Sequence, residues 1–168
     1  MQPVNAQQAN HNIEWMQDGM RQFLTFCLND EEYGVDILQV NEIRGWAPTT
    51  NLPDTPPFVK GVINLRGIIV PIIDLRERFS LETIEYGPTT VVIVLNVNNN
   101  GKNLVLGIVV DAVSDTHTVN QSDIRLSPDY GDTLNTQYLQ GLVEIEDKLI
   151  LLLNIDTLLT AQQLEQVS

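Results

Sequence analysis

The feature of this sequence that most constrains its fold is a series of short apolar runs, separated by turn residues. β-branched residues favour strands, and continuous apolar runs are typical of strands buried on both faces. Short strands at fairly regular spacing favour small barrels or a sandwich over a parallel α/β sheet, so we expect a mainly β protein. The runs are FLTFCL (23–28), YGVDIL (33–38), VINL (62–65), IIVPII (68–73), VVIVL (91–95), LVLGIVV (104–110), YLQGLVEI (138–145) and LILLL (149–153).

Turn residues between neighbouring runs predict three hairpins. Asn98-Asn99-Asn100-Gly101 and Glu146-Asp147-Lys148 are each typical of a hairpin turn, and Arg66-Gly67 is expected at the tip of a third. Pro71 lies inside a predicted strand and cannot donate a ladder hydrogen bond, which predicts an edge position or a bulge there.

Helix is predicted in only two places. Asp74 with an acidic residue three positions later is typical of a helix N-cap, and we expect a short helix to about Leu81. Asn154 is expected to cap a last helix that buries apolar residues. These apolar residues are Ile155, Leu158 and Leu159.

A break near Tyr86-Gly87-Pro88 predicts two lobes of similar strand content, about 21–86 and about 87–156. The polar residues 1–20, rich in Gln and Asn, predict a flexible tail. Residues 161–168 are expected to be a helix end or a tail.

The charge of the chain argues against several partner classes. The formal net charge is −13, and the nine Lys and Arg residues are spread along the chain. A phosphate-binding surface needs clustered cations, so we expect no nucleic-acid partner and no binding to an anionic membrane. The longest apolar run, Leu104–Val110, is too short to cross a bilayer. The first twenty residues contain no Lys or Arg, and the single Cys27 excludes an internal disulfide, which together predict the cytoplasm.

Reactive groups are few, which predicts a protein without catalytic residues, cofactor or metal. His11 lies in the predicted tail, His117 has no evident partner ligands, and Cys27 has no evident histidine partner. Asp111 and Asp115 lie four residues apart at a strand end, where a solvated pair is the ordinary interpretation. A small β-barrel enzyme or ligand binder that uses these two aspartates remains the alternative.

Four glycines and one arginine stand out among the apolar runs. Gly61, Gly67, Gly107 and Gly141 each interrupt or border a strand, which indicates turns, bulges or the close approach of another backbone. Barrel corners explain most of them, and a docking surface for a partner helix would explain some. Arg66 is either a solvated hairpin residue or an anchoring donor for a partner carboxylate.

Matching segments over residues 21–160 resemble the CheW family. The segments that carry this resemblance are EYGVDIL (32–38), VNEIRG (40–45), FVKGVINLRG (58–67), IVPIIDLR (69–76), TVVIVL (90–95), GIVVDAVSD (107–115), YLQGL (138–142) and LILL (149–152). The resemblance implies two five-stranded SH3-like β-barrel lobes packed on a shared apolar core. Short helices, including one at the C-terminus, complete the implied fold.

The resemblance also implies a non-catalytic scaffold. CheW-like proteins bind the cytoplasmic hairpin tip of methyl-accepting chemoreceptors and the regulatory domain of the histidine kinase CheA, with which they alternate in rings. Other CheW-like chains are further expected partners. The chain is then a cytoplasmic protein that is recruited to membrane-associated receptor arrays. The sequence leaves open whether such an array controls swimming, surface motility with pili or a second messenger.

The family's binding residues map onto two regions of this chain. The receptor groove, expected between the lobes, corresponds to Val40, Glu42, Gly61, Arg66 and Gly107. In this interpretation the small residues let a receptor helix approach closely, and Arg66 adds a charged contact. The kinase contact corresponds to the segment 124–130, in which three residues match the family in type. These residues are Arg125, Asp129 and Tyr130.

Overall fold

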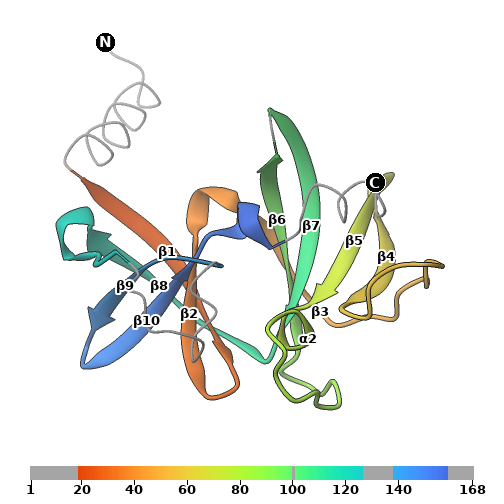
Figure 1. The fold of residues 1–168 in the computed structure, drawn as a ribbon, viewed down its shortest axis with the longest axis horizontal. Helices are drawn as coiled ribbons and strands as arrows, with labels where there is room; N and C mark the ends of the chain where they lie inside the picture. The colour runs from red at the N-terminus through yellow and green to blue at the C-terminus, as the bar shows by residue number, and fades with distance from the viewer. Residues whose placement is uncertain (1–18, 100, 127–137, 159–168) are drawn as a thin grey trace, which may run out of the picture.

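Two five-stranded β-sheets lie side by side in the computed structural model, which describes residues 19–99, 101–126 and 138–158 (Figure 1). Sheet A contains, in spatial order, β8 (Ala112–Asn120), β1 (Met20–Leu28), β2 (Glu31–Asp36), β10 (Lys148–Leu153) and β9 (Leu139–Ile145). Sheet B contains β3 (Val40–Gly45), β6 (Val91–Asn99), β7 (Lys102–Val110), β5 (Ile68–Asp74) and β4 (Val59–Leu65). The predicted mainly β class is confirmed.

The two sheets do not correspond to the two halves of the chain. The hairpin β1–β2 from the first half joins β8, β9 and β10 from the second, whereas the hairpin β6–β7 from the second half joins β3, β4 and β5 from the first. The expected lobes of 21–86 and 87–156 are therefore wrong. The break near residue 87 separates two groups of five strands, and each group contributes one two-stranded hairpin to the sheet formed mainly by the other.

The predicted hairpins are present, and their turns have the backbone twist that two-residue hairpins favour. Both central residues have positive φ at Arg66-Gly67 (+50° and +86°) and at Glu146-Asp147 (+51° and +65°). This conformation matches the right-handed twist of the flanking strands. Asn29-Asp30, which the sequence analysis did not single out, forms a turn of the same kind between β1 and β2. The segment 98–101 joins β6 to β7, as expected.

The expected edge position of Pro71 is wrong, because β5 lies between β4 and β7. The parallel ladder between β5 and β7 begins only at Ile72, so Pro71 stands just before it. The irregularity lies instead in the neighbouring strand, between Val59 and Gly61 of β4. A proline is tolerated here, although β5 is not an edge strand, because Pro71 precedes the first residue pair of the β5–β7 ladder.

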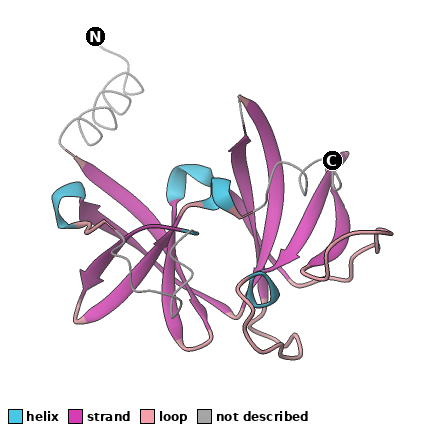
Figure 2. Ribbon diagram, in the orientation of Figure 1, coloured by secondary structure: helices cyan, strands magenta, loops and turns pink. Residues whose placement is uncertain are grey.

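Within the described residues, helices are as scarce as predicted (Figure 2). Asp74 caps α2 (Leu75–Arg78) by accepting hydrogen bonds from the N–H groups of the next turn, although the helix ends before Leu81. Near the C-terminus there is a 3₁₀ turn, η5 (Ile155–Thr157), in place of the expected helix, and the Asn154 side chain does not cap it. The predicted tails fall almost entirely outside the described residues. Two further 3₁₀ turns are η1 (Ile37–Gln39) and η2 (Gln121–Asp123).

Among the residues that the structure describes, backbone pairing joins the outer strands of each sheet at one bridge only. Thr50, after β3, forms a single antiparallel bridge with Val62 of β4. Arg125, after β8, forms the same bridge with Leu142 of β9. The expected barrels are therefore two sheets whose outer strands meet at one bridge rather than along a full ladder.

A glycine precedes each bridge, and in both places the reason is close approach of the backbone. A Cβ on Gly61 would lie 2.2 Å from the carbonyl oxygen of Thr50, and Gly61 has a φ of +131°. A Cβ on Gly141 would lie 2.7 Å from the carbonyl oxygen of Arg125. Real Cβ atoms do not approach so closely, so these bridges require residues without a side chain.

The sheets pack against each other through a shared apolar core, as the resemblance implied. Alternate residues of each central strand face this core, and the intervening residues face the interior of their own sheet. The strands are thus buried on both faces, which explains why they are continuous apolar runs. The buried strand residues of the shared core are Leu24, Phe26, Leu28, Val35 and Leu153 from sheet A, and Val59, Ile73, Ile93, Leu95, Val97, Leu106, Ile108 and Val110 from sheet B.

Replacing Gly107 with alanine is expected to destabilise the protein by about 1–3 kcal/mol. Its added Cβ would lie 2.7 Å from both Ile72 Cδ1 and Val92 Cγ1, inside sheet B. Urea denaturation should therefore show a lower midpoint for Gly107→Ala. Gly45→Ala is the matched control, because a Cβ there meets nothing within 4 Å. Equal midpoints for the two variants would contradict this packing.

Separate expression of residues 1–86 and 87–168 is expected to give two fragments without native β-structure. Each fragment lacks three strands of one sheet and two of the other, because the strands are exchanged. Mixing the fragments should restore the β-sheet signal in circular dichroism and a cooperative thermal transition. Cooperative unfolding of either fragment alone would show that the exchange does not govern stability.

Candidate functional site

The five residues of the expected receptor groove all belong to sheet B. Val40 and Glu42 lie in β3, Gly61 in β4, Arg66 in the β4–β5 turn and Gly107 in β7. Val40 also packs against the shared core. None of the five lies in sheet A, so a groove between the sheets would be completed by other residues.

Arg66 and Glu42 form an exposed ion pair across sheet B. The Arg66 guanidinium donates to Glu42 Oε1 at 2.8 Å, and 70% of the Arg66 side chain remains exposed. The pair connects β3 with the β4–β5 turn, and these belong to opposite edges of the sheet. Because the guanidinium has several N–H donors and most of it is exposed, it can still donate to a partner carboxylate or carbonyl.

Gly61 and Gly107 face their own chain and not an open surface. Gly61 receives the Thr50 carbonyl, and the missing side chain of Gly107 makes room for Ile72 and Val92. The idea that these glycines let a partner helix approach is therefore replaced by packing within sheet B. Both glycines affect the surface only through the packing of the residues beneath it.

Two exposed isoleucines beside Arg66 were missed in the sequence analysis. Ile68 and Ile69 follow the β4–β5 turn directly and are 53% and 58% exposed. We call Glu42, Arg66, Ile68 and Ile69 the sheet B tip. As consecutive strand residues they point to opposite faces, so each sheet face has one exposed apolar side chain near the Arg66 turn. The apolar run 68–73 indicated a buried strand, and nothing in its composition marked the first two residues as exposed.

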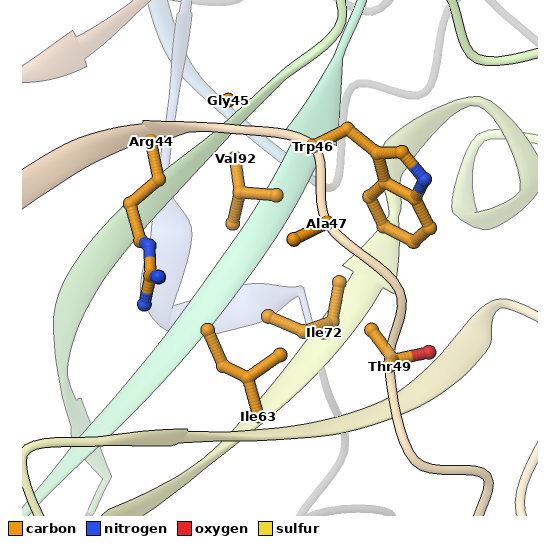
Figure 3. A pocket seen from close by; sticks show the side chains of 8 residues that line it. All are labelled: Arg44, Gly45, Trp46, Ala47, Thr49, Ile63, Ile72 and Val92. Carbon is orange, nitrogen blue, oxygen red and sulfur yellow. The ribbon is translucent and has the colours of Figure 1, made fainter.

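A small apolar notch opens on sheet B where β3 and β4 are not paired (Figure 3). Its free volume is about 20 Å³, which holds about one water molecule and no organic cofactor. Arg44 and Trp46 flank it, and the apolar side chains of Ile63, Ile72 and Val92 form its floor (Figure 3). The notch is therefore part of the sheet interior and not a substrate site.

Of the expected kinase contact, the structure describes only its beginning. Arg125 is exposed, and its backbone forms the bridge to Leu142 that joins the outer strands of sheet A. Asp129 and Tyr130 lie outside the described residues. Leu126, which the sequence analysis passed over, is 85% exposed and is therefore a further candidate for contact with a partner.

Asp111 is not free for catalysis, because Arg76 holds both of its oxygens. Arg76 Nε and Nη2 donate to Asp111 Oδ1 and Oδ2 at 2.8 and 2.7 Å, and the Asn29 N–H donates to Oδ2 at 2.9 Å. Burial raises the pKa of the Asp111 carboxyl, but these hydrogen bonds outweigh burial and hold it below its ordinary value. This carboxylate is a structural group that joins α2 to the β1–β2 turn.

Asp115 does not form an acid/base pair with Asp111. Its Oδ1 accepts a hydrogen bond from the Thr116 N–H, and its backbone pairs with the Thr25 hydroxyl. Asp115 and His117 line a shallow polar hollow on sheet A, but Asp111 does not. The arrangement therefore does not support the ligand-binding alternative based on these two aspartates.

No metal-binding cluster occurs in the described parts of the chain, where three or more His, Cys, Asp or Glu residues nowhere come together suitably. Within the same residues, no helix has the length and apolar character needed to cross a membrane.

Comparisons with known proteins agree with this architecture. The family described as CheW-like domain matches residues 22–163. The chemotaxis protein CheW of Klebsiella aerogenes is 46% identical over 147 residues, covering 88% of this chain and 86% of that protein. CheW of Rhizobium meliloti is 38% identical over 148 residues, covering 88% of this chain and 93% of that protein.

A solved structure extends the likeness to three dimensions. The crystal structure of the scaffolding protein TtCheW from Thermoanaerobacter tengcongensis superposes with a TM-score of 0.76 at 30% sequence identity. The match covers 85% of this chain and 90% of that one. With a family match over most of its length and relatives of this identity, the chain belongs to the CheW family of chemotaxis proteins.

Proposed function

We propose that this chain is a non-catalytic coupling protein, which links chemoreceptor tips to the histidine kinase CheA and gives receptors control of kinase activity. The observation that carries the proposal is the sheet B tip, where an exposed arginine lies beside two exposed isoleucines. Membership of the CheW family supports the same conclusion.

The sheet B tip is the surface that we assign to the receptor. Val40 and Glu42 lie on β3, the outer strand at this surface, and Arg66 lies on the turn across from it. A receptor helix would lay apolar side chains on one of the two isoleucines and offer an acceptor to the Arg66 guanidinium. Gly61 and Gly107 contribute indirectly, because they set the path of β4 and the packing beneath it.

We assign the regulatory domain of CheA to the segment that follows η2. Arg125 and Leu126 offer an exposed cation and an exposed apolar side chain next to each other. The family resemblance adds Asp129 and Tyr130. Because this segment belongs to sheet A and the tip belongs to sheet B, the two partners would bind without competing for the same residues.

The proposed setting is the cytoplasm, at receptor arrays on the membrane, where the chain would alternate with the kinase domain and with other CheW-like chains in rings. An array with a non-flagellar output would use the same two surfaces. Co-purification from the native cell identifies the array, because the kinase and receptors retained with this chain are specific to it.

Charge reversal at the tip is expected to abolish most receptor binding. Arg66→Glu removes the donor and places a second carboxylate beside Glu42, and binding of a receptor cytoplasmic fragment should weaken at least about ten-fold. The side chain is exposed, so the circular dichroism spectrum should not change. Lys102→Glu, at the exposed start of β7 in the same sheet, is the matched control. Unchanged receptor affinity in Arg66→Glu would exclude the tip as the receptor surface.

The opposite selectivity is expected for the segment after η2. Arg125→Glu keeps the backbone bridge to Leu142 and should weaken binding of the CheA regulatory domain by about ten-fold, while receptor affinity stays within about two-fold. Isothermal titration with each partner measures both effects. A loss of receptor binding, with kinase binding intact, would mean that the two surfaces are assigned the wrong way round.

A further inference from the structure

The starting point of the inference is Asp74, a carboxylate that is only 3% exposed. One of its oxygens caps α2 by accepting from the Arg76 N–H at 2.9 Å. The other oxygen accepts a hydrogen bond from the Tyr86 hydroxyl. Burial, and then this hydrogen bond, raise the pKa of the Tyr86 hydroxyl, so Tyr86 is a fixed donor at physiological pH. A buried carboxylate thereby connects the loop before β6 with the first turn of α2.

On the side of sheet B, the contacts continue from Tyr86 to the end of β3. The Tyr86 and Trp46 rings have centroids 4.3 Å apart, at an interplanar angle of 54°. Trp46 directly follows β3, and its backbone N–H donates to the Thr90 carbonyl at 3.2 Å. The tyrosine therefore contacts the residue that directly follows β3, the strand that carries Glu42.

On the side of sheet A, the contacts continue from α2 to the start of β8. Arg76 donates two hydrogen bonds to Asp111, which directly precedes β8, and a third to the Glu82 carbonyl at 2.8 Å. Asp111 in turn accepts from the Asn29 N–H in the β1–β2 turn. The bidentate geometry fixes both the position and the orientation of the pair.

These contacts form one continuous chain, which we call the α2 relay. Its members, in spatial order, are Trp46, Tyr86, Asp74, Arg76, Asp111 and Asn29. We propose that the α2 relay couples the end of β3 to the start of β8, so that a displacement of one outer strand is transmitted to the other. β3 and β8 are outer strands of the two sheets, and each continues toward one of the proposed docking surfaces.

The relay is suited to transmission because its links are directional. The apolar core also joins the sheets, but hydrophobic contacts are non-directional and do not fix an orientation. A bidentate ion pair and a capped helix turn depend strongly on angle and distance. Motion of Trp46 or Tyr86 therefore reaches Asp74, the cap of α2, and through the helix reaches Arg76.

The functional meaning of the relay rests on the proposed function, whereas its existence can be tested in the isolated chain. Tyr86→Phe removes one hydroxyl at the end of the relay near sheet B. Amide hydrogen exchange by NMR then reports on Asn29, at the far end. We expect exchange at Asn29 to accelerate by at least about three-fold, while the core amide of Ile108 in β7 changes less.

The reciprocal variant starts from the other end, because coupling between two sites acts equally in both directions. Asp111→Asn weakens the pair with Arg76 and should accelerate exchange of the Trp46 N–H by a similar factor. Tyr138→Phe is the matched control, since it removes the hydroxyl of another buried tyrosine, which packs on α2 through Phe79 and Arg78 but is not a member of the relay. This control should leave Asn29 and Trp46 at the wild-type rate.

The outcomes separate cleanly. Selective acceleration at the distant amide in both variants supports the relay. Unchanged exchange at Asn29 in Tyr86→Phe, or an equal rise at Ile108, would overturn it, because the effect would then be absent or merely global. Neither measurement uses a partner, so failure of the proposed function would show only in the binding experiments on Arg66 and Arg125.

Discussion

The exchange of a two-stranded hairpin between the halves of the chain is the constraint on which the rest of the structure depends. Each sheet is completed only when strands from both halves have paired, and the shared core forms only between completed sheets. Closure of long loops costs entropy before these contacts form, so the fold is dominated by non-local pairing. The positions of Arg66 and Arg125 are therefore consequences of the whole chain and not of local segments.

The two sheets repeat the same internal solution to packing. In each, a parallel ladder pairs an apolar residue with a glycine: Ile72 with Gly107 in sheet B, and Leu152 with Gly34 in sheet A. A Cβ on either glycine would come within about 3 Å of the side chain it pairs with. The two bridges between outer strands are also equivalent, because in each a glycine precedes the bridged residue of β4 or β9. The strand exchange therefore produces two sheets with the same strand arrangement, and the strands of each sheet come from separate parts of the sequence.

Local features of this fold could be predicted from sequence because local chemistry determines them. The turns at Arg66 and Glu146 and the cap at Asp74 each depend on a few adjacent residues. Features that depend on distant partners could not be predicted in this way. The lobe boundary was wrong because strand pairing ignores proximity in sequence, and Asp111 looked free because its partner, Arg76, comes from another element. The resemblance predicted a partner contact for Arg66 and for two glycines. Only the structure shows that Gly61 and Gly107 face the interior of sheet B.

The β4–β5 and β9–β10 turns occupy equivalent places in the two sheets, yet their chemistry is opposite. Arg66-Gly67 presents a cation, whereas Glu146-Asp147 presents two carboxylates. A partner with an acidic group at this place would be attracted to one turn and repelled by the other. The two sheets therefore share one strand topology but differ in the charge of this turn, so a charged partner can distinguish one sheet from the other.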